Sequence, residues 1–226
     1  MDFDRMYSVN PGYGKSRFSS TELRDIFVSV VVLSLAFTIM YHDNGFATGF
    51  LMKYGNGAMY AGLFGMSLVL VTVSFLFHEM GHKFAAQKAG LWSEYRMYPM
   101  GLMLALIMSL IGFLFAAPGA VCIAGNMSRE TNGKVSIAGP GVNIVFAAVS
   151  LVLCMAFNGS WLVVPFYLLA SLNAFLAVFN LLPIPPLDGS KVMAWNKGIW
   201  AVAILVAAAE LIALWMYVSS ELYYIL

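Results

Sequence analysis

Three side chains that can bind a metal ion or move a proton fall within five consecutive residues, at His78, Glu79 and His82. Positions four apart on a helix share a face, so both imidazoles can reach one ion while the glutamate lies beside them. Neutral imidazole suits Zn²⁺, which takes about three protein ligands and leaves a position for water. Zinc lowers the pKa of such a water to about 7, and a nearby carboxylate can accept its proton. The spacing predicts a zinc site with Glu79 as general base.

The motif lies at the end of an apolar stretch, and this position bears on its meaning. A hydrogen-bonded polar cluster that packs helices together is the alternative interpretation. Ionisable side chains inside a membrane segment are costly and are usually functional. Because three of them occur together here, the sequence favours a site over a packing cluster.

A third metal ligand has to come from elsewhere in the chain, and Asp188 is the candidate. It is the one acidic residue between Glu130 and Glu210. Three prolines within four positions precede it, and they end a helix and stiffen the segment that follows. A rigid segment is suited to presenting a ligand. The alternative for Asp188 is a turn residue or the N-cap of the last helix.

The composition decides the class of protein that must position these residues. Of 226 residues, 61% are hydrophobic and 10% are charged, whereas a soluble domain carries about 25% charged residues. We therefore expect an all-α polytopic membrane protein whose surroundings are the lipid bilayer. The formal net charge is +1, and no basic run is present, so nucleic acid is excluded as a partner.

A membrane-spanning helix needs about 20 mainly apolar residues. Residues 1–24 are polar and form the expected N-terminal segment, and residues 25–226 form one transmembrane domain with a core at about 58–192. About five full spans are predicted in this domain, at roughly Ile26–Tyr41, Ala58–Phe77, Val135–Phe157, Trp161–Leu182 and Ile199–Ser219. A shorter apolar segment, Gly101–Ala117, lies between Pro99 and Pro118.

The distribution of lysine and arginine favours a re-entrant path for this shorter segment. If it enters the membrane and returns on the same side, eleven basic residues lie with the N-terminus in the cytoplasm and only Lys53 lies outside. If it crosses fully, the count becomes seven against five, which fits the positive-inside rule poorly. The re-entrant path also places His78, His82 and Asp188 at the same face of the membrane, open to the cytoplasm.

Three motifs in this order resemble the site-2 protease family of intramembrane zinc peptidases, over about Ser67 to Val192. They are the HExGH form at His78–His82, the GPGVN stretch at Gly139–Asn143, and the Asn-x-x-Pro…Asp-Gly segment at Asn180–Gly189. The resemblance implies one zinc ion per chain, bound by His78, His82 and Asp188, with Glu79 as general base.

The resemblance also implies two further features. Asn180 matches a polar family position that helps to position substrate or to stabilise the oxyanion, a role that preorganised donors commonly play. A helix-packing hydrogen bond is the alternative for that residue. The stretch Gly119–Gly125 is expected to form a short membrane-associated β element that pairs with extended substrate. For Gly139–Asn143 we expect close helix packing through small residues.

These observations together predict an intramembrane zinc endopeptidase that hydrolyses peptide bonds within or near transmembrane segments of membrane-protein substrates. The alternative is a metal-ion transporter that uses His78, His82 and Asp188 as its site. A transporter would gain from paired repeats, which the sequence lacks, and would have no evident need for Glu79.

Overall fold

The computed structural model of the protein describes residues 18–42, 56–112 and 118–220. Four of the basic residues whose side of the membrane was predicted therefore lie outside the described residues: Arg5, Lys15, Arg17 and Lys53. Within these ranges the elements follow one another as α1 (Ser20–His42), α3 (Asn56–Val71), the π-helical turn η3 (Thr72–Leu76), α4 (Phe77–Lys88), β1 (Trp92–Met97), α5 (Pro99–Ser109), β2 (Gly119–Ala124), α6 (Arg129–Ala156), α7 (Val163–Leu181), α8 (Asp188–Trp195) and α9 (Lys197–Ser220).

Five helices are long and apolar enough to cross a membrane, as the composition predicts. They are Ser20–His42, Gly57–Lys88, Arg129–Ala156, Val163–Leu181 and Lys197–Tyr217. The second is continuous through α3, η3 and α4, so the HExGH motif is the last part of a long helix. The structure confirms an all-α polytopic architecture with a small β element.

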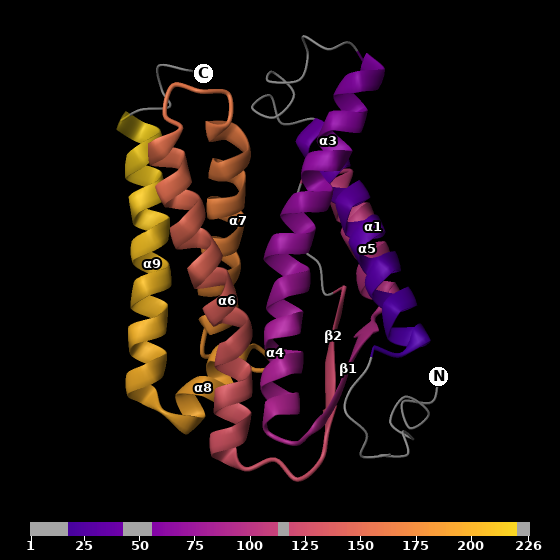
Figure 1. Ribbon diagram of the computed structural model, residues 1–226, viewed down its shortest axis with the longest axis vertical. Helices are drawn as coiled ribbons and strands as arrows, with labels where there is room; N and C mark the ends of the chain where they lie inside the picture. The colour runs from indigo at the N-terminus through magenta and orange to yellow at the C-terminus, as the bar shows by residue number, and fades with distance from the viewer. Residues whose placement is uncertain (1–17, 43–55, 113–117, 221–226) are drawn as a thin grey trace.

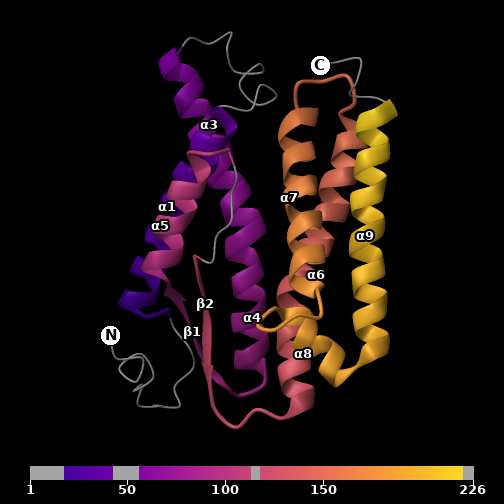
Figure 2. The same cartoon turned by 180° about the vertical axis from the view of Figure 1, so that it is seen from behind.

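Helix α4 lies between two parts of the molecule (Figures 1 and 2). On one side it packs against α6, which belongs to a group of three long helices with α7 and α9. On its other side it contacts β1 and β2, and beyond the strands lie α1 and α5. The motif helix is therefore in contact with both halves of the fold.

The two strands form an antiparallel pair whose register runs from Trp92 opposite Ala124 to Met97 opposite Gly119. The backbone N–H of Tyr98 also donates to the carbonyl of Pro118, at 2.8 Å. The apolar segment between the strands thus leaves the sheet and returns to it at neighbouring points. This is the path that a re-entrant segment requires.

Three details differ from the predicted boundaries. The helix of the short apolar segment begins at Pro99 and ends at Ser109, and residues 113–117 lie outside the described residues. The predicted boundary between the N-terminal segment and the transmembrane domain, after residue 24, falls within α1. The division into these two parts stays a prediction. Strand β1 was not predicted, because Trp92–Met97 combines charged and aromatic residues that give no clear alternation of apolar side chains.

Side chains from both parts of the molecule meet in its interior. Leu33 of α1, Leu63 and Leu70 of α3, and Leu168 of α7 belong to the largest buried cluster. A second cluster joins α6, α7 and α9 through small residues that let the helices approach closely, an arrangement common among membrane helices. These contacts fix the positions of α6 and α7, and a third cluster joins α4 to α6.

Candidate metal centre

Helix α4 places the two histidines on the face that packs against α6. His78 and His82 are one turn apart, both are buried, and their ring centroids lie 4.7 Å from each other. Their Nε2 atoms are 3.0 Å apart. The helix thus brings two imidazole nitrogens to one point, as the four-residue spacing predicts.

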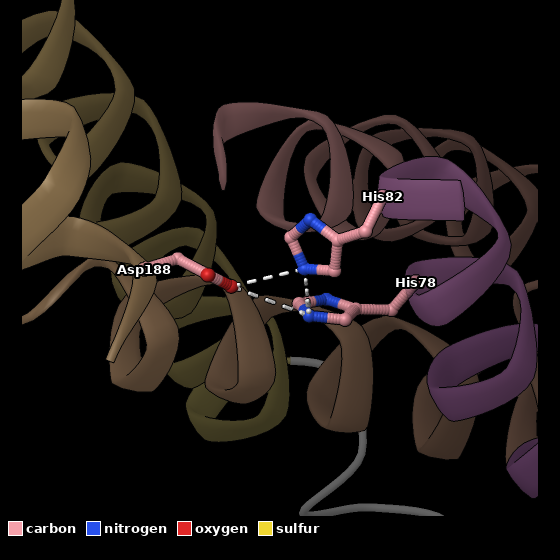
Figure 3. Close-up of side chains that lie close together, drawn as sticks. All are labelled: His78, His82 and Asp188. Atoms are coloured by element: carbon pink, nitrogen blue, oxygen red, sulfur yellow. Dashed lines mark hydrogen bonds and ion pairs between the residues drawn. The ribbon is translucent and has the colours of Figure 1, made fainter. Parts of the chain in front are cut away.

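Asp188 meets the two imidazoles from the opposite side, at the first residue of α8 (Figure 3). Its Oδ2 atom lies 3.0 Å from Nε2 of His82 and 3.6 Å from Nε2 of His78. One ligand atom from each residue lies within 4.8 Å of the others. The structure therefore brings Asp188 to two histidines that lie much earlier in the sequence, while the role of the three side chains as metal ligands stays a prediction.

The segment that carries Asp188 is held in place by contacts with the end of α7. The indole N–H of Trp200 donates to the carbonyl of Leu181, at 2.8 Å, and a Cβ atom at Gly189 would overlap the same carbonyl group. Ser190 Oγ donates to the carbonyl of Leu187, at 2.7 Å. The carboxylate is consequently presented by backbone that has little freedom to move.

The imidazole of His78 is oriented by Asn143 of α6. The Asn143 amide nitrogen donates to the carbonyl of Ser74 at 2.7 Å and to Oδ1 of Asn173 at 2.8 Å. Because a backbone carbonyl can only accept, the oxygen of the Asn143 amide must be the atom that lies 2.5 Å from His78 Nδ1. Nδ1 of His78 is therefore the protonated nitrogen, and its Nε2 presents a lone pair.

His82 is oriented in the same way by the backbone. Its Nδ1 lies 2.9 Å from the carbonyl oxygen of Val135, which again fixes the proton on Nδ1. A ligating histidine almost always donates its second ring N–H to such a partner. Two Nε2 lone pairs and a carboxylate oxygen then face one another, an arrangement that a cation among them would stabilise.

The spacing of these atoms fits zinc. Atoms bound tetrahedrally at about 2.0–2.2 Å from a common ion lie roughly 3.3–3.6 Å from each other. The observed separations are 3.0, 3.0 and 3.6 Å. Two imidazoles and one carboxylate also form a donor set that occurs in catalytic zinc sites, where a fourth position remains for water.

Gly139 leaves the space that the imidazoles occupy. A Cβ atom there would overlap Nε2 of His82 and would lie 2.7 Å from Nε2 of His78. Gly139–Asn143 was predicted to serve helix packing alone, and its two contacts with the site were not foreseen. The signal was present, because Asn143 is an amide side chain in the mainly apolar part of α6.

The charge of Asp188 follows from its surroundings. Lys191 lies one turn along α8, and its Nζ is 3.3 Å from Oδ1 of Asp188. The carboxyl group is therefore an anion in this site.

Glu79 contacts the sheet. Its carboxylate is buried, with 7% of the residue exposed, and Oε2 accepts a hydrogen bond from the backbone N–H of Val121, at 3.1 Å. The carboxylate thus lies between the outer edge of β2 and the helical turn that carries the histidines. A water molecule beside the histidines would have a proton acceptor there.

Asn180 is half-buried near the end of α7, and its amide nitrogen donates to the carbonyl of Leu176, at 3.0 Å. This bond lies within one helix, so it supports neither the substrate-positioning role nor the helix-packing alternative. Among the contacts that the structure describes, Asn180 has no hydrogen bond to His78, Glu79, His82 or Asp188. Its role in catalysis stays a prediction.

Comparison with known proteins adds a separate line of support. The family model described as "Peptidase family M50" matches residues 155–220 of this chain, which include Asp188. The "Putative zinc metalloprotease MJ0611" of Methanocaldococcus jannaschii is 39% identical over 189 residues, covering 82% of this chain and 90% of the relative.

Two further relatives carry similar names. The "Zinc metalloprotease MJ0392" of the same organism is 27% identical over 76% of this chain and 41% of its own length. The "Putative zinc metalloprotease YwhC" of Bacillus subtilis is 32% identical over 56% of this chain and 66% of its own length. No solved structure matches the chain.

Proposed function

The chain belongs to peptidase family M50, the site-2 protease family of zinc metallopeptidases, and we propose that it hydrolyses peptide bonds within or beside the transmembrane segments of membrane-protein substrates. The observation that carries this proposal is the meeting of His78, His82 and Asp188 beside Glu79, at the end of an apolar helix long enough to span a bilayer. The chain is an integral membrane protein, so its substrates share the bilayer with it.

The three ligands we assign to zinc are His78, His82 and Asp188. When bound, zinc supplies a Lewis acid that polarises a carbonyl and lowers the pKa of water to about 7. Asn143 and the Val135 carbonyl hold the two imidazoles with Nε2 toward the site. The fixed backbone around Gly189 does the same for the carboxylate.

Glu79 performs the proton transfers in this mechanism. Its carboxylate accepts a proton from the attacking water and then passes that proton to the amine that leaves the cleaved peptide bond. A positioned general base of this kind commonly contributes about 10²–10⁴-fold in rate. The burial of Glu79 keeps the carboxylate close to the reacting atoms and away from bulk water.

The substrate has to present an extended backbone, because a helical peptide bond is shielded and internally hydrogen-bonded. Strand β2 has an outer edge directed at Glu79, as the Val121 hydrogen bond indicates. Pairing at this edge would hold an unwound substrate segment beside the site.

We place the site at the cytoplasmic end of the spans. Lys88 ends α4, Arg129 begins α6, and Lys191 lies on α8 beside Asp188. These basic residues belong to the end of the molecule that holds α8 and the start of α6 (Figure 1). The positive-inside rule favours this end for the cytoplasm.

A peptidase accounts for more of the observations than a metal-ion transporter does. Glu79 has a clear place in hydrolysis, and the names of the relatives specify proteolysis. The deciding experiment uses the purified full chain, its measured zinc content and a transmembrane test substrate. Wild type should bind zinc and cleave, and Glu79→Gln should bind zinc without cleaving. Full cleavage by Glu79→Gln would reject the mechanism, and zinc flux into liposomes without cleavage would favour the transporter.

A further inference from the structure

The same pair of opposing strand residues, Tyr95 and Val121, is bound by a carboxylate at each edge of the sheet. The N–H of Tyr95 donates to Oε1 of Glu22 at 2.9 Å, and the N–H of Val121 donates to Oε2 of Glu79 at 3.1 Å. In an antiparallel ladder, alternate pairs direct their N–H groups away from the partner strand. Both edges of the two-stranded sheet are therefore capped at the same level.

The cap at the β1 edge is part of a fully buried ion pair. Nζ of Lys83 lies 2.7 Å from both carboxylate oxygens of Glu22, and neither side chain has any exposed surface. Lys83 also donates to the carbonyl of Ser93, at 3.2 Å. A second acid of α1, Asp25, accepts the N–H of Met97 at 3.4 Å. An added strand would have to break a buried ion pair to reach this edge.

The cap at the β2 edge is different in kind. Glu79 retains some exposure and holds Val121 through one carboxylate oxygen, and the described contacts include no lysine or arginine paired with it. Glu79 and Lys83 are one turn apart on α4, so one helical face reaches both strands. A substrate carbonyl that pairs with β2 at this level must accept a hydrogen bond from the Val121 N–H. In the substrate-free protein, the Glu79 carboxylate accepts that hydrogen bond.

We propose that the Val121 N–H is an exchangeable donor: the backbone carbonyl of an extended substrate displaces Glu79 from it, and the released carboxylate then serves as the base. Substrate pairing and release of the base are thereby one event. The Glu22–Lys83 ion pair confines pairing to the β2 edge. This inference rests on the proposed function, because it assumes that Glu79 is the base and that the substrate is extended.

The test compares substrate binding by two zinc-loaded variants that should not cleave. Glu79→Gln keeps a side-chain carbonyl that can accept the Val121 N–H, whereas Glu79→Ala has no competitor for it. A net hydrogen bond corresponds to roughly 2–10-fold in an equilibrium. We therefore expect Glu79→Ala to bind a fluorescent transmembrane substrate about 2–10-fold more tightly than Glu79→Gln does, in the same detergent.

Adding Val121→Pro to each variant should abolish that difference, because proline has no N–H to exchange. Proline is tolerated at a sheet edge where the lost N–H points out of the ladder. Ile123→Pro is the matched control, since Ile123 lies two residues along the same edge and its substitution should preserve the difference. Equal affinities, or a difference that persists with Val121→Pro, would overturn the inference.

Hydrogen exchange at the Val121 amide gives a second readout that needs no proline variant. Exchange should be faster in Glu79→Ala than in wild type, and bound substrate should slow it in Glu79→Ala. A Val121 amide that substrate leaves unprotected would also overturn the inference. Neither result bears on the proposed function, which is tested separately by the zinc content and the cleavage activity of wild type and Glu79→Gln.

Discussion

The side-chain oxygen of Asn143 lies 2.5 Å from Nδ1 of His78. The nitrogen of the same amide donates to the carbonyl of Ser74 and to Oδ1 of Asn173. The asparagine thereby fixes which nitrogen of the imidazole is free for a metal ion. Ser74, which accepts from Asn143, lies in the π-helical turn η3, directly before the motif. Such turns frequently occur at functional sites. The irregular turn supplies a carbonyl that orients a residue of another helix.

Replacing Asn143 with alanine should weaken zinc binding by roughly 10–100-fold, the usual effect of removing a hydrogen-bond partner of a ligating histidine. The imidazole would lose its fixed tautomer and orientation. Zinc affinity is measured by competition with a chromogenic chelator. Asn132→Ala, near the start of the same helix, is the control and should bind zinc as wild type does. Unchanged affinity in Asn143→Ala would show that His78 needs no such partner.

Alanine at Gly139 should abolish zinc binding and cleavage, because its Cβ would overlap the Nε2 atoms of His78 and His82. Gly141 provides a matched control on the same helix, since a Cβ there meets no atom within 4 Å. Gly141→Ala should retain both zinc and activity. Zinc content by atomic absorption and cleavage of the test substrate measure the two effects, and a zinc-replete Gly139→Ala would contradict the prediction.

Breaking the buried ion pair should destabilise the protein. Lys83→Met leaves Glu22 charged and without its partner in a fully buried site, at a cost of about 3–5 kcal/mol. The double variant Glu22→Gln/Lys83→Met should be more stable than Lys83→Met alone. Thermal unfolding in detergent measures both differences. Lys134→Met, which removes an exposed ion pair with Glu130, should leave the unfolding temperature unchanged.

Cys122 offers a pH-dependent test of the sheet's surroundings. Burial raises the pKa of this thiol, and the nearby Arg96 offsets only part of the effect. Because the thiolate is the reactive form, alkylation by iodoacetamide should be slow at neutral pH. Its rate should rise with a midpoint above the ordinary thiol pKa of about 8.5. Mass spectrometry of the modified peptide follows the reaction, and Cys122→Ser is the control. A midpoint below pH 8 would mean that the strand is more solvated than the structure shows.

Much of the fold could be predicted because membrane helices obey a local rule. Each span needs enough consecutive apolar residues, so hydropathy located all five helices. It missed polar ends such as Phe77–Lys88, which continues the second helix beyond its apolar part. The short segment after Pro99 was predicted to return to its starting side, and the pairing of Met97 with Gly119 provides that path. Strand β1 escaped prediction because its residues show no clear alternation of apolar side chains, and because its pairing partner lies beyond the whole apolar segment.

In the candidate site, too, the locally determined features could be predicted and the long-range contacts could not. The sequence by itself determined that His78 and His82 share a helical face with Glu79 next to them, because helical periodicity is a local property. It also singled out Asp188 as an acid with no other acidic residue near it. Only the tertiary structure decided that Asp188 meets the imidazoles, that Asn143 and Gly139 shape their surroundings, and that Glu79 caps β2. Those contacts depend on how separate helices pack, and packing is set by the complementary surfaces of many side chains, which no single stretch of sequence contains.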